Sequence, residues 1–139
     1  MTIPQLLDVS PLSITIKWSD LSDTKLNGGD IPIFYQIEYS PNNSTWTVLN
    51  TGADLVFTYL HTVTTVFPSM STQYYRVRAK NNVGIGFPSP SLAVTADSPP
   101  TGMTTIKNGT INPMDITITW PDLTDTALTG GDPIIFYLV

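Results

Sequence analysis

The sequence predicts an all-β protein, a sandwich of two antiparallel sheets, and three observations carry that prediction. Hydrophobic and polar residues alternate with a period of two over most of the chain, which is typical of strands with one buried face. Proline and glycine clusters interrupt the alternation about every ten residues, a spacing typical of short strands joined by tight turns. No stretch of helical period is longer than two turns, so we expect strands rather than helices.

Seven strands are expected in the first part of the chain, with boundaries at the turn clusters. They lie near residues 3–9, 12–19, 31–40, 45–49, 56–66, 72–80 and 91–96. The alternation is clearest in the second, fifth and sixth of these strands, which are rich in isoleucine, valine, threonine and tyrosine, the residues that strands favour. Three further strands are expected near residues 103–107, 114–120 and 134–139.

The last three strands are expected because the chain repeats itself. Residues 13–37 recur as residues 115–139 at an offset of 102 residues, and 15 of the 25 pairs are identical. We therefore expect a complete domain at residues 1–98 and the first three strands of a second domain at residues 99–139. Residues 97–102 between them include two prolines, which predicts a short, stiff linker and end-to-end domains. Met1 matches the internal Met103, so we expect this chain to be a segment of a longer array; the alternative is an initiator methionine that coincides with the repeat register.

Charge and composition exclude several classes of function. The net charge is −5 with only 6 basic residues, which argues against nucleic acid as a partner because phosphate binding needs clustered lysine and arginine. The chain has no cysteine, so neither a disulfide nor a thiolate site can form. No apolar run is long enough to span a bilayer, and the first residues do not have the pattern of a signal peptide.

The residues after Phe67 carry a resemblance to a known family. The run S-T-Q-Y-Y-R-V-R-A-K-N-N-V-G-I-G at residues 71–86, with Trp18 ahead of a glycine-rich turn and the Tyr35/Tyr39 pair, resembles the fibronectin type III domain. The resemblance implies an immunoglobulin-like sandwich of seven strands. It also implies that Tyr74 is a tyrosine corner, a residue whose hydroxyl caps upstream backbone.

Four aromatic residues are expected to be core residues rather than ligand contacts. They are Trp18 and Tyr35 and their repeat partners Trp120 and Tyr137. Trp46 lies beside a turn and could alternatively stack on a sugar. The only histidine, His61, is expected to be a partly exposed strand residue.

No catalytic constellation is present in the sequence. One histidine without cysteine cannot form a metal cluster, and no nucleophile has a fitting motif. We expect no enzyme activity, no cofactor and no metal. The acidic loop with Asp20, Asp23 and Asp30, repeated at Asp122, Asp125 and Asp132, could supply oxygen ligands to Ca²⁺. A turn built on Gly28 and Gly29 explains the same residues better, because glycine provides the backbone freedom that a tight return requires.

Polar and charged residues offer two further candidate sites. Asn43 and Asn108 begin N-glycosylation sequons, and Asn42 begins one that overlaps the first. The alternative is that these asparagines are turn residues. Arg76, Arg78 and Lys80 line one strand face, where we expect solvation or pairing with Glu38 or Asp54, the alternative being a patch for an anionic ligand.

Two hypotheses of function follow. The first is a non-enzymatic structural or adhesive protein, an extracellular tandem array that forms a stalk, fibre or filament with other copies as partners. Strands from a neighbouring copy could complete the unfinished domain. The second hypothesis is a binding module of a receptor or of a carbohydrate-acting enzyme, with glycans among the ligands. An intracellular scaffold is a third reading of the same features.

Overall fold

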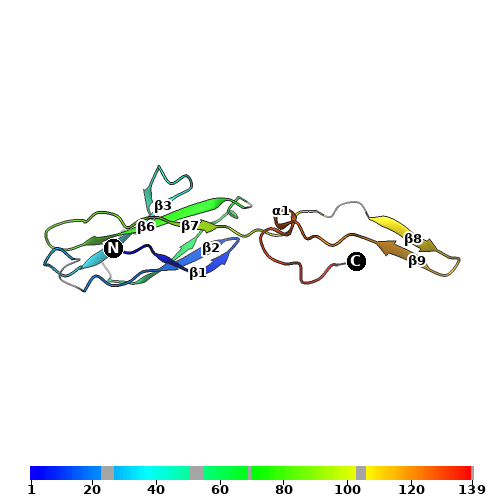
Figure 1. The fold of residues 1–139 in the computed structure, drawn as a ribbon, viewed down its shortest axis with the longest axis horizontal. Coiled ribbons are helices and arrows are strands. Elements are labelled where there is room, and N and C mark those ends of the chain that lie inside the picture. Colours follow the sequence, from blue (N-terminus) through cyan, green and yellow to red (C-terminus); the bar gives the residue numbers. More distant parts are fainter. Residues whose placement is uncertain (23–26, 51–54, 69, 103–105, 139) are drawn as a thin grey trace.

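The computed structural model describes residues 1–22, 27–50, 55–68, 70–102 and 106–138. Seven strands of the first repeat (residues 1–98) form two antiparallel sheets (Figure 1). One sheet has the order β1-β2-β5, with β1 at Gln5–Ser10, β2 at Ser13–Lys17 and β5 at Thr58–Thr62. The other has the order β4-β3-β6-β7, with β4 at Thr47–Val48, β3 at Phe34–Ser40, β6 at Thr72–Lys80 and β7 at Leu92–Thr95. The predicted all-β sandwich is confirmed.

Strands β3 and β6 form the longest ladder of the described chain. Their register runs from Phe34 opposite Lys80 to Ser40 opposite Tyr74. In β6 the residues Gln73, Tyr75 and Val77 are buried and the residues between them are half-buried. This period-two burial is what alternation in the sequence predicted, and it fixes which side chains of β6 face the core.

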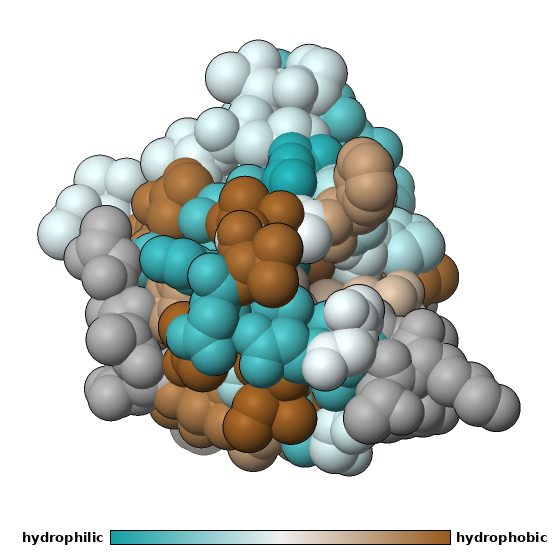
Figure 2. Space-filling view, turned by 90° about the vertical axis from the view of Figure 1, so that its left-hand side faces the viewer, coloured by the Kyte–Doolittle hydropathy of each residue, from teal (hydrophilic) through white to brown (hydrophobic). Residues whose placement is uncertain are grey.

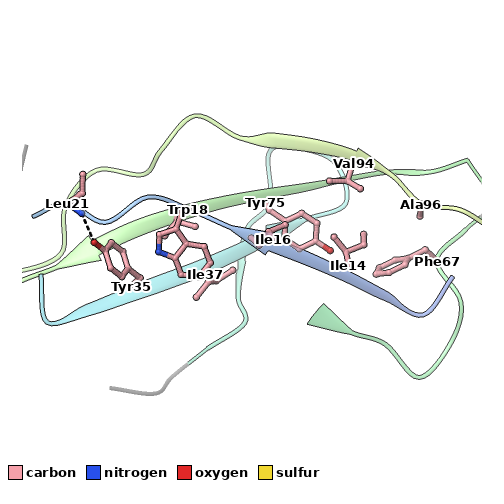
Figure 3. Packing of buried hydrophobic residues seen from close by; sticks show 11 residues of the cluster. Ile14, Ile16, Trp18, Leu21, Tyr35, Ile37, Phe67, Tyr75, Val94 and Ala96 are labelled. Atoms are coloured by element: carbon pink, nitrogen blue, oxygen red, sulfur yellow. Dashed lines mark hydrogen bonds between the residues drawn. The ribbon is translucent and has the colours of Figure 1, made fainter. Parts of the chain in front are cut away.

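The core lies between the two sheets and draws on both (Figure 3). Its fully buried members include Ile14 and Ile16 of β2, Tyr35 and Ile37 of β3, and Tyr75 and Val77 of β6. Burial of each such side chain stabilises the fold by about 1.5–3 kcal/mol relative to exposure. Trp18, Leu21, Phe67, Val94 and Ala96 extend this cluster toward the two ends of the sandwich.

The second repeat (residues 99–139) holds less regular structure. It has a two-stranded sheet of β8 at Lys107–Ile111 and β9 at Ile116–Thr119, and a short helix α1 at Thr126–Thr129. Of the strand expected at residues 103–107, residues 103–105 lie outside the described residues. β8 begins at Lys107, the position that matches the start of β1 in the repeat register. The strand expected at residues 134–139 is wrong, since residues 134–138 form no strand; Val139 lies outside the described residues.

The missing third strand has a physical cause. In the first repeat, β3 pairs over seven residues with β6, and the 139 residues hold no second copy of β6. A strand without a partner leaves its backbone groups unpaired, and two strands alone are marginally stable. All residues of β8 and β9 are exposed. Trp120 and Tyr137, expected in a core, are consequently only half-buried.

Strand β1 enters at one end of the sandwich and β7 leaves at the other, where the chain continues into the second repeat (Figure 1). The first end carries Met1, the loop between β2 and β3, and the loop between β6 and β7. No helix in the described part of the chain is long and apolar enough to cross a membrane.

Candidate functional site: the loop pole of the sandwich

The loop between β2 and β3 is organised by the Tyr35 hydroxyl. This hydroxyl donates to Asp20 Oδ1 at 2.8 Å and accepts from the backbone N–H of Leu21 at 2.9 Å. The Tyr35 ring meets Trp18 edge-on with centroids 5.9 Å apart. Burial, together with the neighbouring Asp20 carboxylate, raises the pKa of Tyr35 to about 12. Tyr35 therefore stays protonated near neutral pH and anchors the loop rather than acting as a base.

The two glycines of this loop have backbone angles that favour glycine. Gly28 has φ of +75° and Gly29 has φ of +88°, in the left-handed region where a Cβ is disfavoured. The Asn27 side chain closes the turn, its Oδ1 accepting from the Gly29 N–H at 2.9 Å. The expectation that Gly28 and Gly29 serve a tight turn is confirmed.

Asp30 joins the loop between β2 and β3 to the loop between β6 and β7. The Asp30 carboxylate accepts from the backbone N–H of Asn82 at 3.1 Å, in the loop between β6 and β7. Asn81 of that loop donates to the backbone carbonyl of Asn27 at 3.2 Å and to that of Asp30 at 3.4 Å. Asp23 lies outside the described residues. The described residues include no group of three His, Asp or Glu that could hold a metal.

A hollow of about 530 Å³ lies between these loops, at the end of the sandwich that Figure 2 faces, where hydrophobic side chains are exposed among polar ones. Its lining includes Met1, Asn27, Gly28 and the exposed Val83 and Phe87. We call this end, with residues 18–22 and 27–33 between β2 and β3 and residues 81–91 between β6 and β7, the loop pole. Asn27 is only 8% exposed, and its Nδ2 has no hydrogen-bond partner among the described residues.

In the second repeat, the corresponding loop contacts the linker of residues 97–102 through Leu128 and Gly130. The Ser98 N–H donates to the Gly130 carbonyl at 2.9 Å, and the Thr101 N–H donates to the Leu128 carbonyl at 2.9 Å. Burial, with the nearby charge of Asp132, raises the pKa of Asp97 in this linker. The sequence did not predict this contact, because it depends on how closely two backbones approach.

The outer face of the β4-β3-β6-β7 sheet carries a charged cluster. Glu38 pairs with Arg76 at 2.5 Å and with Arg78 at 2.9 Å, as the sequence predicted. The Arg76 guanidinium also lies over the Trp46 ring, 3.9 Å from its centroid. Trp46 thus has an intramolecular cation as its neighbour. Asp54, the other partner considered for these arginines, lies outside the described residues.

His61 lies half-buried between the sheets. Its Nδ1 is 2.9 Å from the Tyr75 hydroxyl, and its ring contacts Tyr39, Phe67 and Tyr75. Burial lowers the pKa of His61 and raises the pKa of Tyr75. These two residues form a neutral polar contact within the core.

The expectation for Tyr74 is wrong. Its hydroxyl makes no hydrogen bond to a described residue, and its side chain is on the outer face of β6 because Gln73 and Tyr75 occupy the inward positions. The buried polar contacts at this point come from Gln73, whose Oε1 accepts from the Tyr39 hydroxyl at 2.7 Å.

The three sequon asparagines are exposed. Asn43 sits in a turn with φ of +57°. The Asn42 Oδ1 accepts from the backbone N–H groups of Ser44 at 3.0 Å and Thr45 at 2.9 Å, so Asn42 shapes that turn. Asn108 lies in β8 opposite Ile118.

Taken together, the strand order and the sandwich core define an immunoglobulin-like β-sandwich module. No known family model matches the sequence. Among solved structures, the sixth fibronectin type III domain of human fibronectin type III domain containing protein 3 is similar over 73% of this chain and 89% of its own, with a TM-score of 0.55 and 21% identity. The chain has the fibronectin type III fold.

Multidomain structures show the same fold. Titin domains A168–A170 match with a TM-score of 0.54 and 20% identity over 67% of this chain, which covers 30% of the titin chain. The chicken CNTN1 FN1-FN3 domains match with a TM-score of 0.52 and 21% identity over 89% of this chain and 44% of theirs. The chain is thus a fibronectin type III-type module in its fold.

Proposed function

We propose that this chain is a non-enzymatic structural segment of a tandem fibronectin type III array, packed end to end as an extracellular stalk, fibre or filament. The observation that carries the proposal is the junction between the repeats. Ser98 and Thr101 of the linker donate backbone hydrogen bonds to the loop of residues 128–130. A linker bonded to the following repeat restricts the angle between repeats, which a stiff array requires.

The repeated sequence supports the same proposal, because it builds the same local structure twice. The Tyr137 hydroxyl donates to Asp122 and accepts from the Leu123 N–H, both at 2.9 Å. These bonds match those of Tyr35 at an offset of 102 residues. The match to the three-domain CNTN1 structure extends over 89% of this chain, beyond the first repeat.

Other copies are the partners that this proposal requires. The second repeat exposes apolar side chains that seven strands would cover, among them Ile116 at 74%, Ile135 at 87% and Leu138 at 92%. Strands that follow in the same protein, or strands of a neighbouring copy, would bury them. In an extracellular array, Asn43 and Asn108 are exposed positions for glycans.

The test is a protein in which the second repeat is completed. Val139 matches Ile37 in the repeat register, so residues 38–98 are appended after Val139 to give 200 residues (139 + 61). We expect a monomer whose radius of gyration by small-angle X-ray scattering clearly exceeds the roughly 16 Å of a compact chain of that length. The 139-residue chain should associate as its concentration rises, and the 1–98 segment should not.

A radius near the compact value would contradict end-to-end packing. Equal association of the completed and the 139-residue proteins would contradict strand complementation. Secretion of the completed protein from a eukaryotic cell, followed by mass spectrometry of Asn43 and Asn108, tests the extracellular part of the proposal. Sugar on either residue supports it, and two unmodified asparagines on a secreted protein remove the glycoprotein assignment.

The hollow at the loop pole supports a second candidate, a ligand-binding module of a receptor or of a carbohydrate-acting enzyme. Its lining combines exposed apolar side chains with polar residues such as Asn27, whose buried Nδ2 has no partner among the described residues, a mixture typical of small-ligand sites. Screening the 1–98 segment against a glycan panel by NMR distinguishes the candidates. Shift changes confined to residues 27–31 and 81–87 would favour a binding module.

A further inference from the structure

We propose that the loop pole of the first repeat is a docking site for an inter-repeat linker of the sequence Asp-Ser-Pro-Pro-Thr, the sequence of residues 97–101, supplied by another repeat. The proposal rests on the array proposed above and names the contact that sets its geometry. It is argued from the junction inside this chain, where such a linker is already seated on the same loop.

At that junction the two glycines of the loop make room for the linker. A Cβ added to Gly130 would overlap the backbone carbonyl of Ser98, and one added to Gly131 would lie 2.8 Å from Asp97 Oδ1. Both glycines also have positive φ, +79° and +108°. Glycine is therefore required here for two reasons, the turn and the close approach of the linker.

The first repeat has the matching pair of glycines at the same positions of its loop. Gly28 and Gly29 match Gly130 and Gly131 in register, and their φ values of +75° and +88° give the same turn. A Cβ on either would meet no described atom within 4 Å. The Gly28 carbonyl corresponds to the Gly130 carbonyl, which accepts from Ser98, so it is the expected acceptor for the serine of a docked linker.

Two further features of the loop pole fit this occupant. Asn27 lines the hollow beside Gly28, and its buried Nδ2 has no partner among the described residues. A turn of this side chain would bring the unused donor to a carbonyl of a docked linker. Met1 lines the same hollow and matches Met103, which follows the linker. A linker joined to Met1 therefore arrives at the right place, and its two prolines lose little conformational freedom on docking.

The test joins Asp-Ser-Pro-Pro-Thr-Gly, the sequence of residues 97–102, ahead of Met1 of the 139-residue chain. The matched control carries a Gly-Ser-Gly-Ser-Gly-Ser extension of equal length. We expect the serine amide of the linker extension to exchange with solvent at least tenfold more slowly than the serine amides of the control. We also expect NMR shift changes at Gly28, Gly29 and the Asn27 side-chain amide with the linker extension alone.

Gly28→Asn separates docking from the turn itself, because asparagine tolerates positive φ while its Cβ blocks the approach. With the linker extension, this variant should return the serine amide to the exchange rate of the control. Without an extension it should leave the spectrum of the β-sandwich unchanged. Gly130→Asn should likewise raise the solvent-exchange rate of the Ser98 amide at the natural junction at least tenfold. This second variant keeps the test decisive even if the Gly28 variant folds poorly.

Equal exchange of the linker and control extensions, or protection that survives Gly28→Asn, would overturn the proposal. So would a Ser98 amide that is unprotected in the unmodified chain. This test is independent of the array test. An elongated two-repeat protein whose linker extension exchanges freely would support the array and contradict linker docking. A linker extension whose serine amide is protected from exchange, on a two-repeat protein of compact radius of gyration, would support linker docking and contradict the extended array.

Discussion

The two repeats share one tryptophan–tyrosine contact and differ in what surrounds it. Trp18 and Tyr35 meet at 5.9 Å and 60°, and Trp120 and Tyr137 meet at 5.9 Å and 60°. Yet Trp18 is 6% exposed and Tyr35 fully buried, whereas their counterparts are half-buried. The comparison teaches that a stretch of about 25 residues specifies its own loop and ring contact, while burial depends on strands supplied from elsewhere.

The largest expected difference between the repeats comes from the tryptophans. Trp18→Ala should destabilise the first repeat by about 3–5 kcal/mol, because it removes a large buried side chain from the core. Trp120→Ala should change the same unfolding transition by less than about 0.5 kcal/mol, as expected for a site away from that core. Urea denaturation followed by far-ultraviolet circular dichroism measures both. Equal costs would mean that the two repeats are packed alike, against the burial described above.

The completed second repeat sharpens this first comparison. With residues 38–98 appended, Trp120 gains the strands that bury Trp18, and Trp120→Ala should then cost several kcal/mol in the unfolding of the second repeat.

A smaller difference is expected for the tyrosines. Tyr35→Phe removes one buried hydroxyl that bonds both Asp20 and the Leu21 N–H, which should cost about 1–3 kcal/mol because the buried Leu21 N–H is left unsatisfied. Tyr137→Phe removes the same two bonds at a more exposed site and should cost less than about 0.5 kcal/mol. The free energies of unfolding from urea titrations test the pair. A loss of stability in Tyr137→Phe equal to that in Tyr35→Phe would show that solvent does not replace the second set of bonds.

The smallest expected effect is a dependence on pH that belongs to the first repeat alone, since His61 is the only histidine. Burial lowers its pKa below the ordinary 6.5, so the unfolded chain takes up the proton first as the pH falls. The contribution of His61 to the free energy of unfolding is therefore fully present above about pH 6.5. It decreases below that pH until the pKa of His61 in the folded protein is reached.

His61→Gln should flatten that decrease, because glutamine retains polar atoms for Tyr75 without titrating. Free energies of unfolding between pH 7.5 and 5 check this, with the 1–98 segment as the reference. A stability of the unmodified protein that is constant between pH 7 and 5, or an unchanged slope in His61→Gln, would contradict the assignment.

Alternation in the sequence predicted β6 to the residue, because every second side chain of Thr72–Lys80 faces the core. The same alternation argued against Tyr74 as a tyrosine corner, since Tyr75 and Val77 take the positions of β6 that face the core and Tyr74 lies between the inward positions. The family resemblance outweighed that signal in the sequence-based prediction. Here the local pattern was the better guide.

The misplaced strands of the second repeat have a different cause. Residues 134–138 match residues of the first repeat that lead into and form β3, but strand formation there depends on β6, which is distant in the sequence. The linker contact with Gly130 was also beyond prediction, because a glycine pair signals a turn whether or not another segment lies against it. Nothing in the sequence indicated the role of Asn27, since only the packing reveals that its Nδ2 is buried without a partner among the described residues.

Strands β1 and β7 are the first and last strands of the sandwich, and the chain enters and leaves at opposite ends (Figure 1). A pulling force applied at the two ends of this module would therefore act parallel to these strands, while their hydrogen bonds to β2 and β6 lie across it. Such a force loads all the bonds of a pair together instead of opening them one at a time. The positions of the two chain ends thus define a direction, parallel to β1 and β7, in which such a force would shear these strand pairs.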